Sequence, residues 1–145
     1  MVITKIISYG GKTMIQQHIV KYILNENFMI HLEKNTPSPK EKEEENPIKK
    51  YQWSERQRKL SEYIMKLNYD DIIDLFALCA YGEYKRKNEI YKEDRLSFFM
   101  GLRRDYQLMY PTKDSCKIGI VDMFKDSIYP IYLSLQTALS LYNHL

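Results

Sequence analysis

The segment from Ile72 to Tyr81 is apolar at every position except Asp74. A helix built from such a run has apolar side chains on nearly all of its faces, so other elements must cover it on all sides. This segment therefore predicts a central buried helix, with the rest of the fold arranged around it.

The flanks of this run carry helix start and stop signals. Asn68 is a favoured N-cap residue, because its side-chain oxygen accepts a hydrogen bond from a free backbone N–H of the first turn. The helix dipole favours carboxylates near that end, and the sequence places three there: Asp70, Asp71 and Asp74. Gly82 follows the run, as the residue after a helix end commonly does. The central helix is thus expected to begin after Asn68 and to end before Gly82.

Two amphipathic helices are predicted before the central one. Ser54 and Gln57 have the spacing of a capping box, and apolar residues follow at helical intervals to about Leu67. An earlier helix is expected within residues 14–32, where the helical spacing rests on Ile15, Ile19, Tyr22 and Ile23.

Three helices are predicted after the central one. The first ends before Pro111 and carries Phe99 and Tyr106, with Arg103 extending its stem along the edge of the apolar face. A shorter segment, capped by Asp114 or Ser115 and weakened by Gly119, carries the apolar residues Ile118, Val121 and Phe124. The last helix follows Pro130, and its apolar face contains Ile131, Leu135, Ala138, Leu139 and Tyr142.

The length of 145 residues fits one domain. The fold class expected is all-α, a compact orthogonal bundle of five to six helices, in which residues 14–32 and 54–145 form one domain. Residues 33–53 contain three prolines and a charge run at 40–45, and are expected to form a long mobile charged linker after the first helix. Residues 1–13 are either an N-terminal extension or the first part of a hairpin that turns at Gly10 and Gly11 into a second strand at 13–17.

Composition limits the classes of function. The chain has 22 Lys and Arg against 19 Asp and Glu, a net charge of +3, which is too balanced for binding to a polyanion by overall charge. Cys79 and Cys116 lack metal-ligand spacing, and they favour a reducing, cytoplasmic location. The N-terminus lacks a signal-peptide pattern. Residues 127–145 are uncharged but contain too many polar side chains for a membrane span, so no membrane association is expected.

Catalytic and cofactor motifs are weak throughout. Asp70, Asp71 and Asp74 resemble the DDxxD magnesium motif of helical prenyl-diphosphate enzymes, but the chain is too short for their cavity and second acidic motif, and helix-start chemistry explains the three carboxylates. The three histidines are scattered, at positions 18, 31 and 144. Gly11-Lys12-Thr13 lacks the first glycine of a phosphate-binding loop. We therefore expect no enzyme, no metal and no cofactor.

Cys79 is expected to be an inert thiol with a raised pKa inside the apolar helix, and Cys116, near a helix start, to be the more reactive of the two.

One cluster of basic and aromatic residues is a candidate interaction patch. It consists of Lys85, Arg86, Lys87, Arg95, Arg103, Arg104, Tyr84 and Tyr91. Such a cluster combines phosphate neutralisation with base stacking, but five acidic residues dilute it: Glu83, Glu89, Glu93, Asp94 and Asp105.

The thirteen tyrosines favour a protein interface, because tyrosine buries a large area at low entropic cost. The sequence predicts a small non-enzymatic helical interaction module with a protein partner or a second copy. The alternative is a nucleic-acid-associated or inhibitory regulator of viral or mobile-element type.

Residues 60–84 resemble the middle of a small all-helical bacterial domain family of unknown function. The resemblance rests on a helix, the junction from Leu67 to Asp70, the apolar helix with Asp74-Leu75-Phe76-Ala77-Leu78, and Gly82 after an aromatic residue. Glu83 departs from the arginine that the family places after this glycine. The Tyr- and Leu-rich end at 132–139 is also similar. The resemblance implies a fold and no activity.

Overall fold

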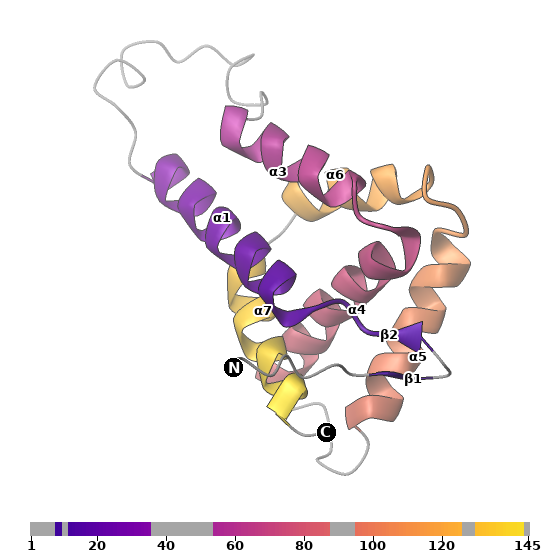
Figure 1. The fold of residues 1–145 in the computed structure, drawn as a ribbon. Coiled ribbons are helices and arrows are strands. Elements are labelled where there is room, and N and C mark those ends of the chain that lie inside the picture. The colour runs from indigo at the N-terminus through magenta and orange to yellow at the C-terminus, as the bar shows by residue number, and fades with distance from the viewer. Residues whose placement is uncertain (1–7, 10–11, 36–53, 88–94, 126–129, 144–145) are drawn as a thin grey trace, which may run out of the picture.

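The computed structural model describes residues 8–9, 12–35, 54–87, 95–125 and 130–143, and the elements named below lie within these ranges. Its six α-helices confirm the all-α prediction (Figure 1). They are α1 (Gln17–Asn35), α3 (Glu55–Met65), α4 (Tyr69–Arg86), α5 (Arg95–Met109), α6 (Cys116–Lys125) and α7 (Ile131–Ala138), and a 3-10 helix, η3 (Leu139–Asn143), continues α7.

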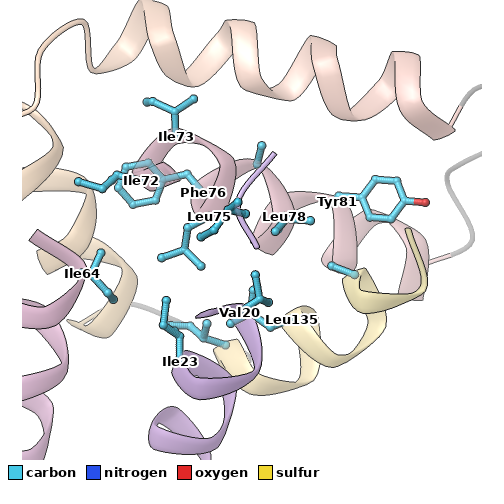
Figure 2. Packing of buried hydrophobic residues seen from close by; sticks show 14 of the residues in the cluster. Val20, Ile23, Ile64, Ile72, Ile73, Leu75, Phe76, Leu78, Tyr81 and Leu135 are labelled. Atoms are coloured by element: carbon cyan, nitrogen blue, oxygen red, sulfur yellow. The ribbon is translucent and has the colours of Figure 1, made fainter. Parts of the chain in front are cut away.

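Helix α4 is the buried centre of the bundle, as predicted from the apolar run. It packs mainly against α7 and α5, while α1 covers α7 and α3, and α3 contacts α6. Figure 2 shows Leu75 and Leu78 of α4 facing Val20 of α1 and Leu135 of α7. All four of these side chains are completely buried, so the core is continuous from α1 through α7 to α4.

The N-caps predicted at Ser54 and Asn68 are present, whereas the Ser115 hydroxyl hydrogen-bonds to the backbone of Thr112 before α6. The Ser54 hydroxyl accepts a hydrogen bond from the backbone N–H of Gln57 at 3.1 Å. The Asn68 side chain accepts one from the N–H of Asp71 at 2.8 Å. These two caps set the starts of α3 and α4 where the sequence predicts them.

Gly82 does not end α4, contrary to the prediction. The helix continues to Arg86, and Gly82 is buried at its crossing with α7. A Cβ atom at Gly82 would overlap the carbonyl group of Ser134. The glycine is therefore explained by a close approach of two helix backbones rather than by a left-handed helix end.

The first helix starts and ends later than predicted. Ile15 precedes α1, and tertiary partners hold both of its backbone polar groups. Its N–H donates to Asp74 Oδ2 at 2.8 Å, and its carbonyl accepts from the Tyr142 hydroxyl at 2.8 Å. At the other end, residues 33–35 continue the helix rather than opening the linker, and Glu33 forms an ion pair with Arg56 of α3 at 3.2 Å. The linker prediction otherwise falls on residues 36–53, which lie outside the described residues.

The hairpin alternative for the N-terminal residues is confirmed in a short form. Strand β1 (Ser8–Tyr9) pairs antiparallel with β2 (Lys12–Thr13), with Ser8 opposite Thr13 and Tyr9 opposite Lys12. The prediction placed the second strand too late, because Met14 and Ile15 leave the hairpin and enter the core.

Helix α6 buries a different face from the one predicted. Cys116, Ile120 and Phe124, four residues apart, point into the core. Ile118 and Val121, which the sequence assigned to the apolar face, are exposed by 62% and 41%. Of the predicted residues only Phe124 is buried, so α6 presents apolar side chains to solvent.

Within the described ranges, no helix combines the length and the apolar character needed to cross a bilayer.

Candidate functional site

A groove of about 530 Å³ follows one face of α4 and is also lined by residues of α5, α6 and α7. Its floor is a single stripe of α4 at helical spacing, formed by Phe76, Cys79, Ala80 and Glu83. We call it the α4 groove and define it by this floor together with Tyr106, Met109, Tyr110, Asp122 and Met123, which form its sides.

Three aromatic rings meet at one end of the α4 groove. The Phe76 ring lies with its centroid 5.6 Å from that of Tyr106 and 5.5 Å from that of Tyr110. The two tyrosines are one helical turn apart, and their rings are nearly parallel, with an angle of 15° and centroids 6.5 Å apart. These separations lie within the range of favourable aromatic contacts, so the rings form one fixed apolar wall.

Gly119 of α6 makes room for this wall. A Cβ atom at this position would lie 2.8 Å from the Phe76 ring and 2.9 Å from the Tyr110 ring. The Tyr69 hydroxyl also donates a hydrogen bond to the Tyr110 carbonyl at 2.6 Å, which fixes the backbone where α5 ends. The glycine that weakens α6 as a helix thus lets α6 pack closely beside the rings.

Two carboxylates and one ammonium group line the α4 groove. Lys87 donates to Glu83 at 3.3 Å, one helical turn away, so this carboxylate has its own counter-charge. Asp122 is exposed and forms no ion pair with any described residue. Asp122 lines the groove together with Tyr110, and burial, then the Asp122 charge, raise the pKa of Tyr110. Burial, with smaller contributions from Cys79 and other neighbours, raises the pKa of Tyr106 to about 12.

One exposed apolar side chain lines the groove, and others are next in sequence to its lining residues. Met109, which lines it, is 60% exposed, and the adjacent Leu108 is 79% exposed. Ile118, which precedes the lining residue Gly119 in α6, is 62% exposed but is not part of the lining. The groove therefore has one exposed apolar side chain at its edge, Met109.

The structure divides the predicted basic patch. Arg103 is buried rather than exposed, and its guanidinium contacts the carboxylates of Asp74 and, at 3.3 Å, Asp70. This contact places the 103–104 region beside the start of α4, whereas Lys85 lies in the last turn. At 1.5 Å per residue, roughly 16 Å of helix separates Asp74 from Lys85. Arg103 and the adjacent Arg104 therefore do not join the basic residues at the end of α4.

The patch residues near the end of α4 are engaged by neighbours. The Lys85 ammonium contacts the Ser140 hydroxyl of η3, and burial, then the charge of Arg95, lower its pKa. Lys87 pairs with Glu83. Tyr84 is half-exposed and packs edge-on against Phe98 of α5, with ring centroids 5.3 Å apart. Arg86 and Arg95 are partly buried, and Tyr91 lies outside the described residues.

Helix-start chemistry does not account for all three aspartates, contrary to the prediction. Asp74 is fully buried, and its two carboxylate oxygens bind Arg103 and the Ile15 N–H. Asp70 shares the same guanidinium. Burial, and then the charges of Asp74 and Asp70, raise the pKa of Asp71. Among the described residues, no group of three or more acidic, histidine or cysteine side chains is placed to hold a metal ion.

The two cysteine thiols are not activated. Burial raises the pKa of Cys79 to about 12, as its place in the apolar helix predicts. Cys116 is the first residue of α6 but is buried, and burial raises its pKa as well. The start of α6 therefore does not make Cys116 the reactive thiol that the sequence suggests.

The sequence did not reveal the α4 groove, although Tyr106 and Tyr110 at a spacing of four and a glycine inside α6 were signals of it. Comparison of the chain with family models, curated proteins and solved structures found no match. The family resemblance at residues 60–84 therefore stays a prediction.

Proposed function

We propose that this protein is a small non-enzymatic interaction module that binds a protein partner in the α4 groove. The observation that carries the proposal is a groove lined by aromatic and methionine side chains, with the exposed Met109 at its edge. Leu108 and Ile118, which are next in sequence to the lining residues Met109 and Gly119, are exposed as well. Apolar surface gathered around a groove is typical of sites where another protein docks.

The dimensions and lining of the α4 groove fit this role. A volume of about 530 Å³ accommodates a few side chains of a partner. The floor at Phe76 and the rings of Tyr106 and Tyr110 are fixed by packing, so ordering them on binding costs little. Aromatic and methionine side chains, here joined by Met109 and Met123, are enriched at the centres of protein interfaces.

A non-enzymatic role agrees with the chemistry of the groove. Its thiol, Cys79, has a raised pKa, and its tyrosine hydroxyl groups are held in the protonated form by the raised pKa values of Tyr106 and Tyr110. None of these groups is a ready nucleophile or base near neutral pH. Because both cysteines are free, we propose the cytoplasm as the compartment.

The alternative function, a nucleic-acid-associated or inhibitory regulator, has less support. It depends on a continuous basic surface, and Arg103 is buried while Lys87 is paired with Glu83. Among the described patch residues, Arg104, Lys87 and Tyr84 are exposed.

The test is capture of partners from the source cells with wild type and with a Met109→Glu, Ile118→Glu variant. Both side chains are more than half exposed, so the variant should fold. We expect proteins captured by wild type to be lost with this variant and retained by Leu32→Glu, a matched change at an exposed position on α1. Equal recovery by all three proteins would exclude the α4 groove as the binding site. The captured partner is then purified, and its Kd for each protein is measured.

A further inference from the structure

We infer that the α4 groove binds an arginine side chain of the partner, with the guanidinium against the rings of Tyr106 and Tyr110 and paired with Asp122. The inference rests on the proposed function, and it adds the chemistry that the groove selects. The observations behind it are the parallel tyrosine rings, the Asp122 carboxylate that lines the same groove and the Gly119 contact that joins α6 to the rings.

The aromatic wall supplies the first part of the site. The faces of aromatic rings carry negative potential and attract a cation placed over them. Tyr106 and Tyr110 direct two nearly parallel rings to the same groove, and Phe76 closes the end behind them. A planar guanidinium stacks on such rings better than the compact ammonium group of lysine does, which favours arginine.

The charges of the groove supply the second part. Glu83 is already compensated by Lys87 at 3.3 Å. Asp122 has no cationic partner among the described side chains, so the groove as described keeps an uncompensated negative charge at its α6 side. A neutral apolar segment would leave that carboxylate without a partner on binding, whereas a guanidinium would form charge-assisted hydrogen bonds with it.

The position of α6 puts the Tyr110 ring and the Asp122 carboxylate within reach of one side chain of the partner. Gly119 brings α6 against the Tyr110 ring, and Asp122 follows three residues later on the groove side of the same helix. Met109 and Met123 line the space beside them. The apolar stem of an arginine packs on such side chains while its head reaches the carboxylate.

The test uses two small probes that differ in charge and share a shape, N-acetylarginine amide and its neutral isostere N-acetylcitrulline amide. Each is titrated into the isotopically labelled full chain, and the amide chemical shifts of α5 and α6 are followed by NMR. We expect saturable shifts at Tyr106, Tyr110 and Asp122, and at least about fivefold weaker binding of the citrulline probe.

Asp122→Asn should weaken binding of the arginine probe by about fivefold and leave the citrulline probe unchanged. The matched control is Asp114→Asn, because the Asp114 side chain is 93% exposed and precedes the same helix. Equal affinity for both probes, shifts outside the groove, no saturable binding or no effect of Asp122→Asn would each overturn the inference. Should the captured partner depend on Met109 and Ile118 but not on Asp122, the proposed function stands and the arginine inference fails.

Discussion

Arg103 of α5 and Asp74 of α4 form an ion pair inside the core, with side chains 8% and 0% exposed. The same carboxylate accepts the N–H of Ile15, so one buried charge joins α4, α5 and the segment before α1. Asp70 contacts Nη2 of the same guanidinium at 3.3 Å. Each charged group of the pair therefore has more than one polar partner, and buried charges need such partners.

Removing one member of this pair should be strongly destabilising. Arg103→Leu leaves the Asp74 carboxylate buried without its counter-charge, which typically costs about 3–5 kcal/mol. Arg104→Leu, at the exposed adjacent position, should change the free energy of unfolding by less than about 0.5 kcal/mol. Urea unfolding measures the change in the free energy of unfolding for both variants. The double variant Asp74→Asn, Arg103→Leu should lose less free energy of unfolding than the two single variants lose together. A loss equal to their sum would contradict a direct interaction between the two side chains.

The hydrogen bond from the Tyr142 hydroxyl to the Ile15 carbonyl gives a second prediction. Tyr142→Phe keeps the buried ring but leaves the carbonyl without its donor, so we expect a loss of about 1–2 kcal/mol. Tyr132→Phe is the control, because no described residue hydrogen-bonds to that hydroxyl. The free energy of unfolding in urea compares the two variants. A loss at Tyr142 no larger than that at Tyr132 would contradict a structural role for this bond.

Local signals in the sequence predicted the helical elements well. The apolar run of α4 and the caps at Ser54 and Asn68 depend on residues close together in the chain. Their hydrogen bonds span three residues, so a sequence pattern contains all of the information needed. The same reasoning predicted the raised pKa of the Cys79 thiol.

The sequence predictions were wrong where a residue's environment depends on residues far away in the chain. Gly82 has the pattern of a helix end, but the backbone of Ser134, far along the chain, explains it. Arg103 has the pattern of a surface cation, but a carboxylate 29 positions away holds it inside. The α4 groove likewise depends on α5, α6 and α7 meeting around α4, which no local pattern contains. Residue type alone therefore drew attention to the charged residues as a candidate patch and not to the aromatic wall of the groove.

The raised pKa of Cys79 predicts a loss of stability in alkali. Its pKa is about 12 in the folded protein against 9.0 for an exposed thiol, so the unfolded chain loses its proton first. The stabilisation that the protonated Cys79 thiol gives the folded state is complete below pH 9. It is lost as the pH rises toward 12, at no more than about 1.4 kcal/mol per pH unit. Cys79→Ala should show a shallower decline in urea unfolding over this range. Parallel curves for the two proteins would contradict the prediction.

The two glycines inside α4 and α5 should respond to alanine in opposite ways. At Gly101 of α5 there is open space around a new Cβ atom, so Gly101→Ala should stabilise the protein by up to about 1 kcal/mol through helix propensity. At Gly82 the new Cβ would overlap the Ser134 carbonyl, so α4 and α7 must separate and core contacts are lost. We expect Gly82→Ala to cost about 1–3 kcal/mol, as overpacking of a core does. Thermal and urea unfolding measure the stability change of both variants. If Gly82→Ala stabilised the protein, α4 and α7 could not approach each other this closely.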